Sequence, residues 1–323
     1  MQAINILFLA PHWRVTLIKA FRKALEELQC SGTLVGLDSD PYSPTLRVMD
    51  SVDVIPRFTA PECLREILDF CRCETVHAVI PLTNKAVEFL DANRTAFQEE
   101  GIRVFLNEQT VIETCHDKYR LAQFFREQGI LAPQTFLGDS NEVGGSFPLF
   151  AKQRRGEGGT HSMVLQDESD LEYCRKKYPD HMIQQLLAGK EYSIDWYSDG
   201  DGNPVVIVPR ERLAIRAGEV RVSRIHLKRE VIDAVRHAGS RIGLQGPCNL
   251  QGILDEAGKF YFIDINLRFG SGSVHSIAAG ANIPYLIYQE IAGQSLPSGI
   301  GPLKDGMVMT RFNDSYYIEE QNR

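Results

Sequence analysis

The first 116 residues alternate short apolar runs with amphipathic segments, and this alternation constrains the fold more than any other feature of the sequence. Apolar runs occur at Ile4–Ala10, Thr33–Asp38, His77–Leu82 and Ile102–Leu106. Between the first two runs, apolar residues recur at positions 17, 18, 21, 25 and 28, which is the spacing of one helical face. Nearly continuous apolar runs are typical of buried parallel strands, and alternation with helices implies a parallel sheet covered by helices. We therefore predict a doubly wound α/β domain over residues 1–116.

The pattern changes from Asp117 onward to α+β. A helix is predicted over residues 118–128, because Gly129 stops it and Pro133 follows. Beyond it the strand-like runs are longer and are joined by glycine-bearing turns at 199–203 and 256–259. These turns predict hairpins and hence antiparallel pairing.

A doubly wound N-terminal domain raises the alternative of a nicotinamide-dependent dehydrogenase. Dinucleotide sites need glycines after the first strand, so that the pyrophosphate can approach the backbone. Here that turn reads Ala10-Pro11-His12-Trp13-Arg14 and contains none. Asp38 does end the second strand, where a ribose-binding acid would lie. Without the glycines, a strand-end or capping role for Asp38 is favoured.

Composition excludes several classes of protein. Lys and Arg number 35 against 42 Asp and Glu, a net charge of −7, which argues against a dedicated nucleic-acid binder. No apolar run reaches the roughly 20 residues of a membrane helix, and the N-terminus lacks the pattern of a signal peptide. The seven cysteines form no Cys-x-x-Cys pair, so free thiols in a reducing cytosol are expected. We expect a cytoplasmic protein that binds neither membrane nor nucleic acid.

One candidate site joins a lysine to a glycine-rich loop. A buried strand delivers Lys152, and Gly156, Gly158 and Gly159 follow shortly after it. Glycines let backbone N–H groups converge on an anion, and the lysine supplies a point charge for phosphate oxygens. The loop is not a P-loop, because no Gly-Lys-Ser/Thr follows the glycines. A flexible hairpin tip beside a surface lysine is the alternative.

A second candidate lies at the connector after a later strand. The connector could offer backbone groups to an adenine edge, and Glu191 could accept hydrogen bonds from ribose hydroxyls. A solvated acid at a strand end is the alternative for Glu191. The residues assigned to the adenine edge are Gln184, Gln185, Leu186 and Leu187.

The strongest candidate is a strand on which Asp264, Asn266 and Arg268 alternate and therefore share one face. Gln251 lies 13 residues before Asp264, on the predicted partner strand, and hairpin pairing can place it on that face. Carboxylate and amide oxygens suit a hard cation such as Mg²⁺, which retains phosphates as further ligands. Arg268 can hold the transferring phosphate. A buried salt bridge between Asp264 and Arg268 is the alternative.

A loop of small residues, 270–273, follows this strand and precedes a helix-like run. Such a loop predicts either an anion site or a simple helix cap.

The order and spacing of these motifs resemble the ATP-grasp superfamily, and within it the carbamoyl-phosphate-synthase-like, carboxylate–amine ligase branch. The resemblance spans residues 4–295 and implies a pre-ATP-grasp domain over 1–116, a small lobe with the lid over 117–187, and a large lobe with the metal site over 188–323. Asp117-Lys118 resembles the entry of that branch, which implies that Lys118 contacts nucleotide phosphate. The strand lysine and glycine-rich loop resemble the lid of that branch, and the connector 184–187 with Glu191 resembles its adenine hinge and ribose acid. Its metal and phosphate residues are resembled by Gln251, Asp264, Asn266 and Arg268.

Two departures from the family pattern matter. The usual metal-binding glutamate is Asp264 here, which is one methylene shorter and puts the number of bound metal ions in doubt. Glu157 adds a negative charge to the lid. Between hinge and metal strand, three arginines occur at 210, 212 and 216. The resemblance implies that Arg212 or Arg216 meets an anionic substrate; a solvated charged loop is the alternative.

The resemblance implies a ligase that uses ATP and Mg²⁺, with Mn²⁺ as an alternative metal, to join a small-molecule carboxylate to an amine through an acyl phosphate. Lys152, Arg212 and Arg268 would be its catalytic residues. Two alternatives stay open: phosphorylation of bicarbonate or carbamate, and a nucleotide-binding regulatory module. Dimers are the commonest soluble assembly, so a homodimer is the default expectation.

Overall fold

The computed structural model describes residues 3–140, 143–156, 159, 161–216 and 218–319. The chain forms two compact units. Unit 1 comprises Met1–Leu106, Asn282–Leu296 and Thr310–Arg323, and unit 2 comprises Asn107–Ala281 and Pro297–Met309. The predicted mixture of a parallel α/β part and an α+β part is confirmed. The predicted boundaries at residues 116 and 187 stay predictions.

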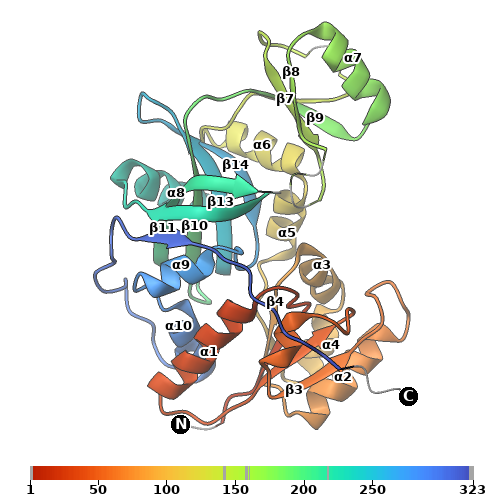
Figure 1. The fold of residues 1–323 in the computed structure, drawn as a ribbon, viewed down its shortest axis with the longest axis vertical. Coiled ribbons are helices and arrows are strands. Elements are labelled where there is room, and N and C mark those ends of the chain that lie inside the picture. Colours follow the sequence, from red (N-terminus) through yellow and green to blue (C-terminus); the bar gives the residue numbers. More distant parts are fainter. Residues whose placement is uncertain (1–2, 141–142, 157–158, 160, 217, 320–323) are drawn as a thin grey trace. The chain divides into compact units, whose positions relative to one another are not determined.

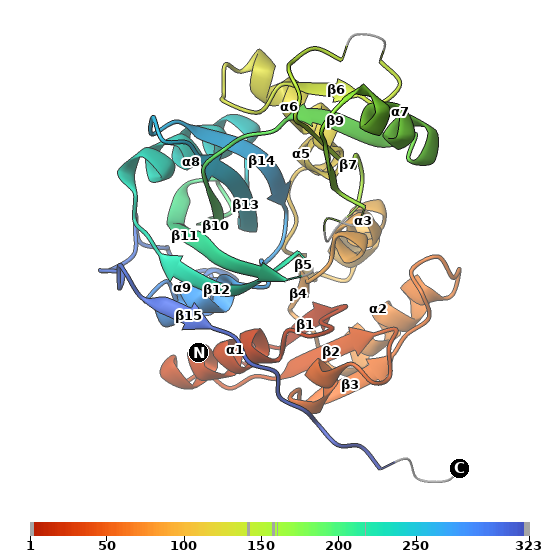
Figure 2. The same cartoon turned by 45° about the horizontal axis from the view of Figure 1, so that its top comes forward.

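Unit 1 is built on a parallel sheet. Over the described residues it has five strands in the order β3-β2-β1-β4-β5 (Figures 1 and 2). Its strands are β1 Ile6–Leu9, β2 Leu34–Asp38, β3 Ser51–Val54, β4 Ala78–Pro81 and β5 Arg103–Val104. Its helices are α1 Val15–Glu27, η1 Pro44–Arg47, α2 Cys63–Cys73, α3 Asn84–Ala92, α4 Arg94–Glu99 and α10 Ile283–Ile291.

The centre of the sheet is where the sequence pattern is clearest. Every residue of β1, β2 and β4 is buried, in agreement with the predicted apolar runs. The edge strand β3 has no apolar run and is largely exposed, which is why the pattern does not reveal it. Helix α1 packs through Phe21, whose ring lies 4.8 Å from that of Phe8 and 6.0 Å from that of Tyr288 on α10.

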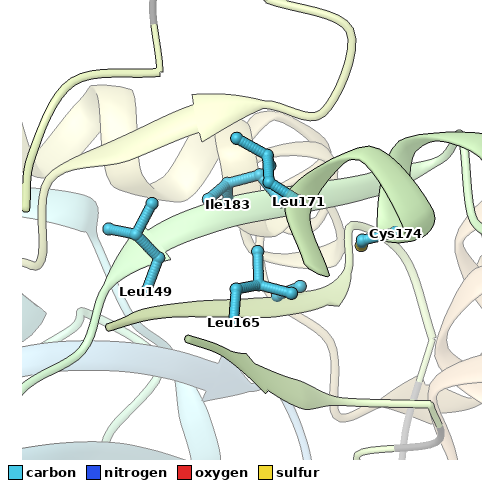
Figure 3. Packing of buried hydrophobic residues seen from close by; sticks show 6 residues of the cluster. Leu149, Leu165, Leu171, Cys174 and Ile183 are labelled. Carbon is cyan, nitrogen blue, oxygen red and sulfur yellow. The ribbon is translucent and has the colours of Figure 1, made fainter. Parts of the chain in front are cut away.

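Unit 2 contains a small antiparallel sheet with the order β6-β9-β7-β8 over the described residues. Helix α7 lies across one of its faces, and Figure 3 shows Leu171 and Cys174 of this helix pointing at Leu149, Leu165 and Ile183 of the sheet. This apolar cluster holds the strand that carries Lys152. The elements are β6 Thr135–Leu137, β7 Leu149–Gln153, β8 Met163–Leu165, α7 Glu168–Lys177 and β9 His181–Gln185.

The larger sheet of unit 2 is curved (Figure 2) and has the order β14-β13-β10-β11-β12-β15 over the described residues. The predicted turns at 199–203 and 256–259 join β10 to β11 and β13 to β14, and both pairs are antiparallel. The strands are β10 Lys190–Ser198, β11 Pro204–Arg216, β12 Glu219–Ile225, β13 Gly246–Leu254, β14 Phe260–Asn266 and β15 Val308–Thr310. The other helices of this unit are α5 Gln109–His116, α6 Lys118–Glu127, α8 Arg229–Ile242 and α9 Ser273–Ala278.

Within the described residues, no helix combines the length and apolarity required to cross a membrane.

Candidate functional site

One face of the six-stranded sheet carries a continuous set of polar side chains. Gln251 of β13 lies directly opposite Asp264 of β14, and its other neighbour is Ser193 of β10. Ser193 in turn lies opposite Arg210 of β11. Because directly opposed residues project to the same face, these four side chains form one row across four strands.

A second row runs beside the first. Asp195 lies opposite Asn249, and Asn249 lies opposite Asn266. On the other side of the first row, Glu191 is ion-paired with Arg212. The intervening residues of β10 project to the opposite face and are fully buried: Tyr192, Ile194 and Trp196. We refer to the polar rows as the polar face.

The predicted metal ligands meet at one end of the polar face. Asn266 Nδ2 donates to Asp264 Oδ2 at 3.3 Å, and Arg268 Nη2 donates to Asn266 Oδ1 at 3.1 Å. Among the described residues no group of three His, Cys, Asp or Glu side chains could hold a metal, so Asp264 would be the principal charged ligand. One carboxylate with amide oxygens beside it suits a hard cation that completes its shell with phosphate and water. The residues therefore fit Mg²⁺.

Lys152 connects the small sheet to this end of the polar face. Its Nζ donates to the backbone oxygen of Ile263 at 2.9 Å. The pKa of Lys152 is lowered to about 8, mainly by burial and also by the charge of Lys118, while Asp264 and Glu191 oppose the shift. The pKa of Lys152 therefore depends on the charges of Asp264 and Glu191, the acids predicted for the metal and the ribose. A half-buried amine with a lowered pKa is favoured in its charged form by an anion.

Lys118 is the first residue of α6 and reaches the lid. Its Nζ donates to the oxygen of Gly156 at 2.7 Å, and its backbone N–H donates to the oxygen of Arg154 at 3.1 Å. The two predicted phosphate lysines, 118 and 152, are thus coupled electrostatically.

Asp117 fixes the start of α6 and the base of the lid. Its carboxylate accepts from the backbone of Tyr119 and Arg120, which caps the helix. Arg154 Nε donates to both oxygens at 2.8 and 2.9 Å, and Arg155 Nη2 lies 3.3 Å from Oδ2. Burial alone would raise the pKa of Asp117, but the hydrogen bonds hold it below its usual value. Asp117 and Lys118 therefore connect the base of the lid to the first turn of α6.

The predicted lid glycines are only partly described. Gly156 and Gly159 have φ angles of 124° and 63°, in the region that favours glycine. Gly158 and Glu157 lie outside the described residues.

The predicted adenine connector, residues 184–187, comprises the last two residues of β9 and the two residues that follow it. Gln184 is buried, and its Nε2 donates to Thr135 Oγ1 at 2.8 Å, which places this side chain within the small sheet. Gln185 and Leu186 are exposed and Leu187 is half-buried, so the connector itself is open to solvent.

Glu191 and Arg212, assigned separately to ribose and to an anionic substrate, contact each other. Arg212 Nη1 donates to Glu191 Oε1, and Arg212 Nη2 donates to the oxygen of Gly218 at 3.0 Å. Burial lowers the pKa of Arg212, against the charge of Glu191. A ligand that binds either side chain must therefore accommodate this ion pair.

The sequence interpretation missed a buried ionic cluster that joins the two rows. Asp195 and Arg210 are each 1% exposed, and Arg210 Nε donates to Asp195 Oδ2 at 2.7 Å. Asn249 Nδ2 and Ser273 Oγ donate to Asp195 Oδ1 at 3.0 and 2.7 Å, and Ser276 Oγ donates to Oδ2. The signal was present, because Glu191, Ser193 and Asp195 alternate along their strand as Asp264 and Asn266 do.

The small-residue loop at 270–273 packs on this cluster. A Cβ at Gly272 would lie 2.4 Å from Arg210 Nη1, and one at Gly270 would lie 2.7 Å from Asn249 Cγ. Ser273 begins α9 and bonds Asp195 instead of capping its own helix. Glycine is required here because the loop backbone approaches buried side chains closely.

Two family models match the sequence. Residues 6–105 match a family described as "PylC-like, N-terminal domain", and residues 177–314 match one described as "ATP-grasp in the biosynthetic pathway with Ter operon". Among proteins with curated descriptions, none is similar enough in sequence to be recognised as a relative.

Several solved structures share the fold. N5-carboxyaminoimidazole synthetase from Staphylococcus aureus, complexed with ADP, has a TM-score of 0.76 at 15% identity, covering 97% of this chain and 83% of that one. L-amino acid ligase from Bacillus licheniformis has a TM-score of 0.71 at 20% identity, covering 90% and 74%. The biotin carboxylase domain of 2-oxoglutarate carboxylase from Hydrogenobacter thermophilus, with MgADP and bicarbonate, has a TM-score of 0.72 at 18% identity, covering 95% and 74%.

Proposed function

We propose that this chain, which belongs to the ATP-grasp superfamily, is an ATP- and Mg²⁺-dependent ligase that joins a carboxylate to an amine through an acyl phosphate. The observation that carries the proposal is the polar face. Its register aligns Gln251 with Asp264, and the amine of Lys152 responds to both Asp264 and Glu191. The charge of Lys152 thus interacts with the acid predicted for the metal and with the acid predicted for the ribose.

The residues then divide by role. Lys118 and Lys152, with the lid glycines 156, 158 and 159, would hold the phosphates, and the connector 184–187 with Glu191 would hold the nucleoside. Asp264, Gln251 and Asn266 would hold Mg²⁺, which when bound would neutralise charge on the phosphates. Arg268, which donates a hydrogen bond to Asn266, would stabilise the transferring phosphoryl group. Mn²⁺ could replace Mg²⁺, since both prefer oxygen ligands.

The reaction needs positioning and charge stabilisation more than a protein nucleophile. A substrate carboxylate oxygen would attack the γ-phosphorus of ATP and release ADP. The amine would then attack the acyl carbon, form the amide, expel phosphate and lose a proton. Arg212, held by Glu191, is the residue we assign to an anionic group of the substrate. Closure of the lid would exclude water, which otherwise hydrolyses the acyl phosphate.

An ADP-release screen over amino acids, alone and in pairs, with Mg²⁺ or Mn²⁺, tests the proposal. We expect ADP release that requires both an acid and an amine, together with an amide product detected by mass spectrometry. Release with one acid alone would indicate phosphorylation without ligation. Nucleotide binding without turnover for any pair would favour a regulatory module.

Phosphorylation of bicarbonate is the second candidate, because one of the structures with this fold holds MgADP and bicarbonate. A bicarbonate arm in the same screen separates the two candidates. ADP release that depends on bicarbonate, and is unaffected by added carboxylic acids, would replace the amide-forming proposal.

A further inference from the structure

Unit 1 holds a histidine in a costly backbone conformation. In the turn after β1, Ala10 has a φ of 53° and His12 a φ of 44°. Residues with a Cβ rarely adopt such angles. The conformation persists only where the surroundings over-determine it, and it is often associated with function.

Three buried side chains fix the backbone of His12. Its N–H donates to Asp38 Oδ2 at 3.0 Å. Its carbonyl oxygen accepts from Ser43 Oγ at 3.0 Å and from Thr45 Oγ1. Asp38, Ser43 and Thr45 are each at most 1% exposed. Both backbone polar atoms of one strained residue are therefore held by residues that follow the neighbouring strand.

Asp38 also fixes the imidazole of His12. The ring nitrogen Nδ1 lies 3.0 Å from Asp38 Oδ2, and the histidine side chain is 43% exposed while the aspartate is buried. Nε2, on the opposite edge of the ring, has no hydrogen-bond partner in the described part of the chain. The arrangement thus presents one oriented ring nitrogen from an otherwise fully anchored residue.

The position in the sheet is one where ligands bind. β1 lies between β2 and β4, so the strand order changes direction at β1. In open α/β sheets, ligands bind outside the carboxyl ends of the strands at such a switch point. The turn at 10–14 leaves the carboxyl end of β1, and Asp38 ends β2.

The charges around His12 favour the protonated imidazole, in which Nε2 carries a hydrogen. The hydrogen bond to Asp38 raises the pKa of His12 above its usual value, with smaller help from Asp40 and against burial and Arg14. Arg14 is therefore close enough to repel the imidazolium. The protonated ring and Arg14 bring two positive charges close together, and Asp38 and Asp40 offset part of this charge. The feature that selects an oxyanion is therefore the Nε2–H donor, which a turn without glycines offers in place of a backbone cradle.

We propose that the carboxyl edge of the unit 1 sheet binds a small-molecule oxyanion, a carboxylate or a phosphate, through the Nε2–H of His12 oriented by Asp38. The site lies wholly in unit 1 and does not depend on the proposed ligase activity.

Imidazole NMR of the full chain, without ATP, tests the site. Inorganic phosphate and acetate are titrated in separate arms at constant ionic strength with chloride. We expect the titration midpoint of His12 to rise by about half a pH unit or more in at least one arm, because a bound anion favours the imidazolium. The arm with the larger shift identifies the anion class. His77, whose Nδ1 accepts from Asn5 N at 3.1 Å, is the internal control.

Two variants sharpen the test. His12→Asn keeps the backbone conformation, which asparagine tolerates, and removes the imidazole. Trp13, which is 82% exposed, then serves as a fluorescence probe of anion binding. We expect phosphate or acetate to change this fluorescence in the wild type and not in His12→Asn. With Asp38→Asn we expect at least a tenfold weaker response, because the ring loses its orientation.

The proposal is overturned if neither anion shifts His12 beyond the chloride control, or if His77 shifts equally. An unchanged fluorescence response in His12→Asn would also overturn it. That outcome stands even if Asp38→Asn fails to fold.

Discussion

Lys152 is the residue whose protonation the proposed site exploits most directly. Its ammonium bonds a backbone oxygen beside Asp264, and burial lowers its pKa to about 8. In the free protein the charged form is therefore lost as pH rises through about 8. Nucleotide phosphates favour the charged form, so nucleotide binding should take up a proton above that pH.

We predict that the dissociation constant for ATP, measured by titration calorimetry, rises roughly tenfold per pH unit above this pKa, as expected for one coupled proton. Lys152→Arg should bind ATP with little pH dependence, because a guanidinium stays charged. Lys152→Met should bind at least tenfold more weakly at pH 7. A pH profile that Lys152→Arg shares with the wild type would assign the titration to another group.

His12 and Asp38 predict a pH-dependent contribution to stability. The pKa of His12 is raised, so its contribution is complete below its unfolded value of about 6.5 and is lost as pH rises through the folded value. Burial would raise the pKa of Asp38, but the bonds from His12 and Asp40 lower it. The contribution of Asp38 is therefore present above about 3.9 and is lost as pH falls. The pair stabilises most between these limits.

We expect His12→Asn to lower the free energy of unfolding more at pH 5.5 than at pH 8.5. Because the imidazole is partly exposed, the difference should be only a few tenths to about 1 kcal/mol. Urea denaturation at both pH values measures it, with His77→Asn as the matched control. A larger loss at pH 8.5 than at pH 5.5 would contradict the assignment.

For individual site residues, the sequence could predict proximity only where the residues share a local pattern. Asp264 and Asn266 share one strand, whereas Arg268, predicted on the same strand, lies beyond its end. The hairpin turn at 256–259 fixes Gln251 opposite Asp264. Asp195 alternates with Glu191 and Ser193 in the same way, but its partners Arg210 and Asn249 lie on two other strands. Which strands become neighbours depends on tertiary packing, so the alternation marks a polar face but does not identify the partners of Asp195.

At the scale of elements, the loop between β14 and α9 is held by close contacts with buried polar side chains. Its two glycines leave no room for a side chain over Arg210 and Asn249, and Ser273 and Ser276 bond Asp195. Burial alone would raise the pKa of Asp195, but Arg210 and the serines hold it below its usual value. The cluster thus ties three strands and one helix to the end of β14, where Arg268 begins the loop.

We predict that Asp195→Asn destabilises unit 2 by about 3–5 kcal/mol, because Arg210 would remain buried without its counter-charge. The double variant Asp195→Leu/Arg210→Met should cost much less than the two single changes together. Trp196, which is fully buried in β10, reports unfolding by fluorescence once Trp13 is replaced by Phe.

Asp233→Asn is the control, because this acid and its partner Arg229 are 64% and 91% exposed. We expect it to change stability by less than about 1 kcal/mol. If Asp195→Asn and Asp233→Asn lowered the free energy of unfolding equally, the buried pair would stabilise the fold no more than a surface ion pair does.

Elements are predictable in proportion to their burial. Strands β1, β2 and β4 are buried along their whole length and were predicted with small errors at their ends. β5 is reduced to two residues of the predicted Ile102–Leu106 run, although the flanking apolar residues are buried as well. Apolar composition therefore predicts burial more directly than it predicts the hydrogen bonds that define a strand.

For the whole molecule, the chain leaves unit 1 after Leu106 and returns to it at Asn282. Helix α10 packs against α1 through Tyr288 and Phe21, and Asn282 Nδ2 donates to Glu27 Oε2 at 2.8 Å. Arg103 is ion-paired with Glu290 of α10. Local periodicity predicts a helix but not the sheet it covers, so this return could not be predicted from the sequence.

Because α10 packs within unit 1, substitutions of its residue Tyr288 can test whether the two units unfold separately. Tyr288 is fully buried, and its hydroxyl finds no hydrogen-bond partner among the described residues. Tyr288→Phe should therefore be neutral or slightly stabilising, because an unpaired buried hydroxyl costs free energy. Tyr288→Ala should cost about 3–5 kcal/mol through the cavity against Phe21. Hydrogen exchange in Tyr288→Ala should show lost protection in β1 and β2 and unchanged protection in β10 and β13. Equal losses in all four strands would mean that the two units open as one cooperative body, and the discontinuous unit would then have no separate stability.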